Sequence, residues 1–131
     1  MVLVDTNIWS RALDRKALNN KEEVDKLKDL ILSSQVVMIG PIRQELLSGI
    51  ACENSLNKLK ANLLAYDDFP ISTHEYVTAA QFYNICRKQG VHGSMTDFLI
   101  CAVAVNNEMY IYTRDKDFDN YAKYLPIKLL R

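Results

Sequence analysis

Short apolar runs alternate with longer amphipathic stretches along the whole chain. The short runs are rich in β-branched and aromatic residues, which is typical of strands buried in a sheet. They predict strands at residues 2–4, 36–39 and 110–113, with a last edge strand at residues 127–130. The first run leads directly into Asp5-Thr6-Asn7, and the second is closed by Gly40-Pro41.

Apolar residues at helical spacing predict the elements between these strands. One helix is expected to begin at Asn20, and Pro41 suits the first position of another because no N–H donor is needed there. The stretch 94–105 is apolar on nearly every side, which predicts a buried central helix. The expected helices cover residues 8–13, 20–31, 41–50, 53–64, 73–89, 94–105 and 117–123.

This alternation of strands and helices predicts an α/β fold around a central, mostly parallel sheet of four or five strands. No repeat or linker divides the sequence, so residues 1–131 are expected to form one domain. In open parallel sheets, ligands bind beyond the carboxyl ends of the strands. The residues that follow each strand are therefore the first candidates for a functional site.

Composition narrows the class of protein. The chain has 16 Lys and Arg against 16 Asp and Glu, and this neutral balance counts against a nonspecific nucleic-acid binder. Three cysteines stand far apart without a CxxC pair, which argues against a disulfide framework or a zinc site. No charged start precedes a long apolar segment, so we expect no signal peptide, no membrane span and a cytoplasmic protein.

Two acids follow predicted strands. Asp5 comes directly after the first strand, and Asp115 follows the strand at 110–113 after one intervening residue. Each has an ordinary structural interpretation, as a helix N-cap or a first-turn acid that interacts favourably with the helix dipole. Position alone does not decide between that interpretation and a role in a site at the sheet edge.

Two further acids lie on the predicted helices. Glu45 falls in the second turn of the helix that begins at Pro41, past the place of a capping-box glutamate. Ser94-Met95-Thr96-Asp97 fits the capping-box pattern, yet Asp97 also opens the most apolar helix of the chain. A carboxylate at that end is expected near the strand termini. There it can both cap the helix and belong to a site at the sheet edge.

The four acids together indicate more than any one of them. Carboxylates brought this close repel one another unless a cation compensates their charge. Oxygen ligands without a Cys/His cluster favour Mg²⁺, or Mn²⁺, over zinc. Divalent ions held by carboxylates suit the attack of water on a phosphodiester, because they lower the pKa of water and stabilise the leaving oxygen.

Four short motifs connect these acids to a known family. They are Asp5-Thr6-Asn7 after the first strand, Pro41-x-x-x-Glu45, Asp97 at the head of the buried helix, and Thr113-x-Asp115-x-Asp117. In this order and spacing, the chain resembles PIN-domain nucleases over essentially its whole length. Within that group it is similar to VapC-type toxin ribonucleases. The resemblance implies a three-layer α/β/α fold.

The resemblance also assigns roles to individual residues. The catalytic acids would be Asp5, Glu45, Asp97 and Asp115, with the cation held by Asp5, Asp97 and Asp115. The residues that orient carboxylates or water would be Thr6, Asn7 and Thr113. Asp117 would support them as an auxiliary acid or a local cap. The basic side chains Arg43 and Arg114 lie close to these acids in sequence and are candidates for contacts with substrate phosphates.

Taken together, these features predict a Mg²⁺-dependent endoribonuclease toxin that hydrolyses RNA and is neutralised by a cognate VapB-like antitoxin. The resemblance further implies a homodimer. One alternative is a metal-dependent phosphohydrolase acting on a small phosphate ester, although Asn7 stands where the aspartyl-phosphate type has its second acid. The other alternative is a module that only binds RNA or a partner protein.

Overall fold

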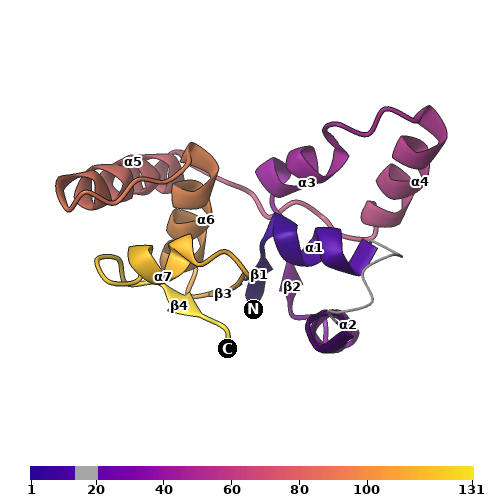
Figure 1. Cartoon of the computed structure of the whole chain (residues 1–131), viewed down its shortest axis with the longest axis horizontal. Helices are drawn as coiled ribbons and strands as arrows, with labels where there is room; N and C mark the ends of the chain where they lie inside the picture. The colour runs from indigo at the N-terminus through magenta and orange to yellow at the C-terminus, as the bar shows by residue number, and fades with distance from the viewer. Residues whose placement is uncertain (14–20) are drawn as a thin grey trace.

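A computed structural model describes residues 1–13 and 21–131 of the chain, and Figure 1 shows its arrangement. The sheet of this described part has four strands, in the order β2-β1-β3-β4. Every neighbouring pair is parallel, with Leu3 opposite both Val37 and Ile111. The predicted α/β fold with a parallel sheet is confirmed. The strands are β1 (Val2–Val4), β2 (Val36–Val37), β3 (Tyr110–Tyr112) and β4 (Lys128–Leu129).

Helices lie on either side of this sheet and complete a three-layer α/β/α fold. In Figure 1, the later helices α5 to α7 gather on one side of the strands and the earlier helices α1 to α4 on the other. The helices of the described residues are α1 (Thr6–Leu13), α2 (Lys21–Leu32), α3 (Gly40–Leu47), α4 (Glu53–Leu63), α5 (Thr73–Lys88), α6 (Met95–Asn106) and α7 (Asp117–Tyr121).

The apolar helix α6 lies at the centre of the core, as its sequence predicts. Every residue from Phe98 to Ala104 is buried, because the helix is covered on all sides by neighbouring elements. The middle residues of β1 and β3, Leu3 and Ile111, are fully buried beside it. Burying apolar surface stabilises the fold by about 25 cal/mol per Å². This core therefore anchors the strand ends and the start of α6 against one another.

Several element boundaries differ from the sequence-based expectations. Helix α3 ends at Leu47 instead of residue 50, because Gly49 adopts a left-handed conformation with φ of 81° that stops the helix. The second strand is shorter than residues 36–39, and Met38 forms only an isolated bridge with Asp68. The expected helix start at Asn20 lies outside the described residues.

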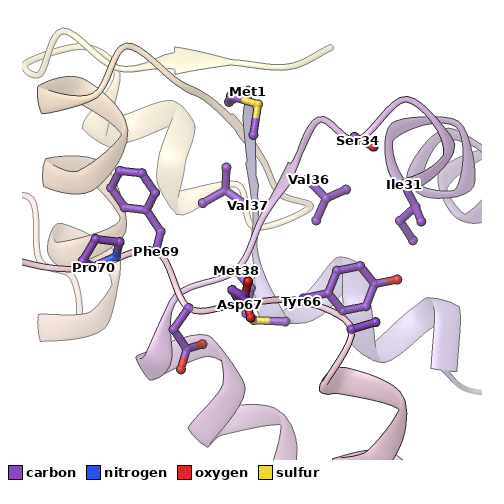
Figure 2. A pocket seen from close by; sticks show the side chains of 12 residues that line it. Met1, Ile31, Ser34, Val36, Val37, Met38, Tyr66, Asp67, Phe69 and Pro70 are labelled. Carbon is purple, nitrogen blue, oxygen red and sulfur yellow. The ribbon is translucent and has the colours of Figure 1, made fainter.

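One apolar pocket lies along the open edge of β2, and Figure 2 shows the side chains that line it. Its walls come from α2, β2 and the segment that precedes α5, with Val36, Val37 and Phe69 among the apolar side chains. The four candidate acids are not among its lining residues. Among the described helices, none is both long enough and apolar enough to cross a bilayer.

Candidate active site

The parallel pairing of β1 with β3 brings two candidate segments together. Val4 lies opposite Tyr112, so the residues that follow both strands emerge side by side at the carboxyl edge of the sheet. The backbone N–H of Asp5 donates to the carbonyl of Tyr112 at 2.9 Å, which continues the pairing by one residue. Asp5 and Thr113 are therefore neighbours in space, although more than a hundred positions separate them in sequence.

Hydrogen-bond donors surround the buried carboxylate of Asp5. Its Oδ1 accepts from the backbone N–H of Thr6 at 2.7 Å, and its Oδ2 accepts from the Thr113 hydroxyl at 2.8 Å. The amide of Asn7 donates to the same Oδ2 at 3.4 Å. Only 7% of Asp5 is exposed, so this carboxylate is held in one orientation.

Burial nevertheless makes the charged form of Asp5 unfavourable. Desolvation raises the pKa of Asp5 from 3.8 to about 6, although the hydrogen bonds from Thr113 and Thr6 act in the opposite direction. The negative charges of Asp97 and Glu45 raise the pKa of Asp5 further. These interactions show that Asp5, which follows β1, lies within electrostatic range of Glu45 on α3 and Asp97 on α6.

Thr113 and Asn7 tie the two strand ends into one network. The Thr113 hydroxyl accepts the backbone N–H of Asp115 at 3.0 Å while it donates to Asp5. The Oδ1 atom of Asn7 accepts the backbone N–H of Arg114 at 3.1 Å. The path of the chain from β3 to Asp115 is therefore set by the same side chains that orient Asp5.

Glu45 reaches the site from α3 through Thr6. The Thr6 hydroxyl donates to Oε2 of Glu45 at 2.6 Å. Glu45 is exposed, and it approaches the cluster from the solvent side. The bond joins the first turn of α1 to α3 and keeps Glu45 within electrostatic range of Asp5.

Three other carboxylates form the tightest acidic group of the described residues. One oxygen from each of Asp97, Asp115 and Asp117 lies within 4.8 Å of the others. The backbone N–H of Asp117 donates to Oδ1 of Asp115 at 2.9 Å, which fixes the turn between them. Burial raises the pKa of Asp97, and the charges of Asp115 and Asp117 raise it further. Asp97 is thus the acid that interacts both with Asp5 and with the pair Asp115 and Asp117.

The structure adds a residue that the sequence reasoning did not select. Tyr121, at the end of α7, is fully buried, and its hydroxyl donates to Oδ2 of Asp97 at 2.7 Å. Tyr121 lies one helical turn after Asp117, so both face the same side of α7. That spacing is visible in the sequence, but only the packing of α7 against α6 identifies Asp97 as the partner of Tyr121.

The two candidate arginines are held by different partners. Arg43 donates to Asp68 at 2.9 Å and to the carbonyls of Leu63 and Tyr66, so its guanidinium joins α3 to the end of α4 and the segment that follows. Arg114 forms an ion pair with Glu23 of α2 at 2.9 Å and stands next to Asp115. A phosphate contact by either arginine stays a prediction.

The donor set of this cluster fits a hard divalent cation. Its candidate ligands are carboxylate oxygens, the donors that Mg²⁺ and Mn²⁺ prefer. The spacing of the Asp97, Asp115 and Asp117 oxygens allows one ion to contact several of them. Burial is the main cause of the raised pKa values of Asp5 and Asp97, and the charges of neighbouring carboxylates raise both further.

Comparison with known proteins places the chain in a family. The PIN domain matches residues 2–124, and the chain therefore belongs to the PIN-domain family. Ribonuclease VapC11 of Mycobacterium tuberculosis is 28% identical over 125 residues, which cover 94% of this chain and 92% of that protein. The predicted family is confirmed.

Solved structures show the same fold. The crystal structure of FitAcB from Neisseria gonorrhoeae superimposes with a TM-score of 0.81 at 22% identity, over 100% of this chain and 97% of the other. The structure of VapBC2 from Rickettsia felis, bound to a DNA fragment from their promoter, gives a TM-score of 0.76 at 16% identity. It covers 99% of this chain and 98% of the other.

Proposed function

We propose that this protein is a metal-dependent endoribonuclease and the toxin of a toxin–antitoxin pair. The observation that carries the proposal is the group of Asp97, Asp115 and Asp117 oxygens within 4.8 Å of one another in a PIN-domain fold, with Asp97 and Glu45 close enough to Asp5 to raise its pKa. Similarity to proteins named VapC ribonucleases supports RNA as the substrate. The likeness to VapBC structures supports a role beside an antitoxin.

In this proposal, Asp5, Asp97 and Asp115 hold Mg²⁺, or Mn²⁺ in its place, and Glu45 and Asp117 complete the acidic rim. When bound, such an ion would supply positive charge to a substrate phosphate and would lower the pKa of a water molecule. Thr6, Asn7 and Thr113 keep the carboxylates in their orientations through the hydrogen bonds described above. Cleavage by water attack is then expected to leave a 5′-phosphate and a 3′-hydroxyl.

Arg114 is proposed as the phosphate contact next to the acids. Arg114 lines a small pocket together with Asp115 and the basic residues Lys116 and Arg131, and its Nε is paired with Glu23. A guanidinium there can donate to a neighbouring phosphate of the RNA strand. We propose the same role for Arg43, although its present contacts to Asp68 and two carbonyls make its release a requirement.

The decisive experiment is cleavage of total RNA by the purified protein in Mg²⁺ and in EDTA, followed by sequencing of the new ends. Mg²⁺-dependent cuts with 5′-phosphates that Asp5→Asn abolishes would support the proposal. Intact RNA in the presence of Mg²⁺ would overturn it. Hydrolysis of a small phosphate ester instead would favour a phosphohydrolase.

The proposed toxin acts in the cytoplasm as a homodimer and is neutralised by a VapB-like antitoxin. Sedimentation of the purified protein at micromolar concentration tests the dimer, and a monomer alone would contradict it. The antitoxin part predicts a small neighbouring reading frame whose product co-purifies with this chain and inhibits its cleavage of RNA. A product that leaves the cleavage unchanged would contradict that part.

A further inference from the structure

Helix α7 contributes two side chains to the acidic cluster from one face. Asp117 opens the helix and Tyr121 closes it, one turn later. The Asp117 carboxylate lies in the tight group with Asp97 and Asp115, while the Tyr121 hydroxyl donates to Oδ2 of Asp97. The same short helix therefore holds one acid and fixes the orientation of another.

Aromatic packing fixes the ring of Tyr121. Its centroid lies 5.0 Å from that of Phe98 and 5.1 Å from that of Phe118, and Tyr121 itself has no exposed surface. Phe98 directly follows Asp97 on α6, so the ring contact and the hydroxyl contact join α7 to the same turn. A side chain held this firmly places its hydroxyl at one position.

Gly93 provides the space that this hydroxyl occupies. A Cβ atom at residue 93 would lie 2.3 Å from the Tyr121 hydroxyl oxygen and 2.7 Å from the ring carbon that carries it. Any larger residue at 93 must therefore push the hydroxyl away from Asp97. Glycine is needed here for its small volume, because the segment before α6 passes directly over the Tyr121–Asp97 bond.

We propose that Tyr121 is a positioning residue for the cation, acting through Asp97, and that Gly93 makes this contact possible. The inference rests on the proposed function, which assigns Asp97 as a ligand. The bond from Tyr121 to Oδ2 restricts rotation of the Asp97 carboxylate, which has an oxygen within 4.8 Å of oxygens of Asp115 and Asp117. Without the hydroxyl, repulsion from those two acids favours rotation of Asp97 out of the cluster.

The test is Mn²⁺ binding, with the metal alone as the probe and free Mn²⁺ measured by electron paramagnetic resonance. Tyr121→Phe keeps the ring and is expected to weaken Mn²⁺ binding about tenfold. Tyr83→Phe is the matched control, because Tyr83 also packs against Phe98, with the two ring centroids 5.6 Å apart. We expect the control to bind Mn²⁺ as the wild type does.

A double-mutant cycle separates positioning from a general loss of structure. In an Asp97→Asn background, Tyr121→Phe is expected to cause no further loss of Mn²⁺ binding. Melting curves in EDTA check that each variant is folded, and Gly93→Ala repeats the test with the hydroxyl displaced instead of removed. If Tyr121→Phe does not fold, unchanged Mn²⁺ binding by Gly93→Ala overturns the inference.

The outcomes distinguish this inference from the function on which it rests. Wild-type protein that binds no Mn²⁺ would overturn both. Wild-type protein that binds Mn²⁺ as tightly as folded Tyr121→Phe would overturn only the role of Tyr121. An equal further loss in the Asp97→Asn background would show that Tyr121 acts through the fold in general, and would also overturn it.

Discussion

The two halves of the acidic cluster are held by different means. Asp5 is buried and receives donors from its own segment and from Thr113, so its orientation is set before any ligand arrives. Asp97, Asp115 and Asp117 are more exposed, and their oxygens lie within 4.8 Å of one another. The first half has its orientation fixed by hydrogen bonds, whereas the second half carries the greater charge repulsion.

The two halves show different ways in which a small fold can hold carboxylates close together. On the Asp5 side, the hydrogen bonds offset part of the cost of burial. On the α6–α7 side, partial exposure to water screens the repulsion, and Tyr121 and the backbone N–H of Asp117 restrict movement. Asp97 interacts electrostatically with Asp5 and also with Asp115 and Asp117. Its substitution should therefore reduce RNA cleavage the most.

The largest effect is expected from Asp97→Asn. Removing its charge takes away the proposed ligand that interacts with Asp5 as well as with Asp115 and Asp117. We therefore expect RNA cleavage in Mg²⁺ to fall by about a thousandfold, a loss of several kcal/mol in transition-state stabilisation. Asp119→Asn is the control, because Asp119 lies on the same helix as Asp117 but pairs with Arg131. Equal rates for the two variants, measured on one RNA substrate, would contradict a central role for Asp97.

A smaller loss is expected from Thr113→Val, which keeps the shape of the side chain. It removes the donor to Asp5 and the acceptor for the backbone N–H of Asp115, so both halves lose orientation. We expect cleavage to fall about 10- to 100-fold. Thr113→Ser keeps the hydroxyl and should cleave nearly as the wild type does. A wild-type rate for the valine variant would show that Asp5 needs no such support.

The burial of Asp5 also predicts an unusual pH dependence of stability, to be measured in EDTA. The pKa of Asp5 is raised from 3.8 in the unfolded chain to about 6 in the fold, so the folded state binds the proton more tightly between those values. The free energy of unfolding therefore falls as the pH rises from 4 to 7, with a contribution of about 2–3 kcal/mol from Asp5.

Asp5→Asn should flatten this dependence, because the asparagine carries no proton to lose. Urea denaturation of both proteins across that pH range gives the comparison as a difference in unfolding free energy. The raised pKa of Asp97 adds a slope of the same sign to both proteins. Parallel curves would contradict the desolvation of Asp5.

The smallest effect is expected at the rim, from Thr6→Val. Its hydroxyl bond to Glu45 joins α1 to α3, but Glu45 is exposed and water competes for it. We expect a loss of about 0.5–1 kcal/mol in unfolding free energy, measured by urea denaturation. Thr6→Ser, which keeps the hydroxyl, should lose less. A larger loss of unfolding free energy for Thr6→Val than for Thr113→Val would contradict the minor contribution of the rim.

Much of the fold follows from local sequence patterns. The β-branched runs, the amphipathic spacing and the apolar stretch of α6 predict the alternating elements, because burial and helix propensity act over neighbouring residues. Where the prediction failed, a local conformation decided the outcome. Gly49 adopts a left-handed conformation, and α3 therefore ends early. Met38 forms only an isolated bridge, so β2 is shorter than its apolar run predicts.

The sequence by itself determined which acids follow strands or open helices, and the order of their motifs identified the family. The sequence did not show which side chains form hydrogen bonds with those acids. Only the tertiary structure decided that Thr113 donates to Asp5 and Tyr121 to Asp97, and that Asp117 lies in the tightest acidic group. The physical reason is that these contacts join elements brought together by packing around α6, and a hydrogen bond depends on distance and direction in space.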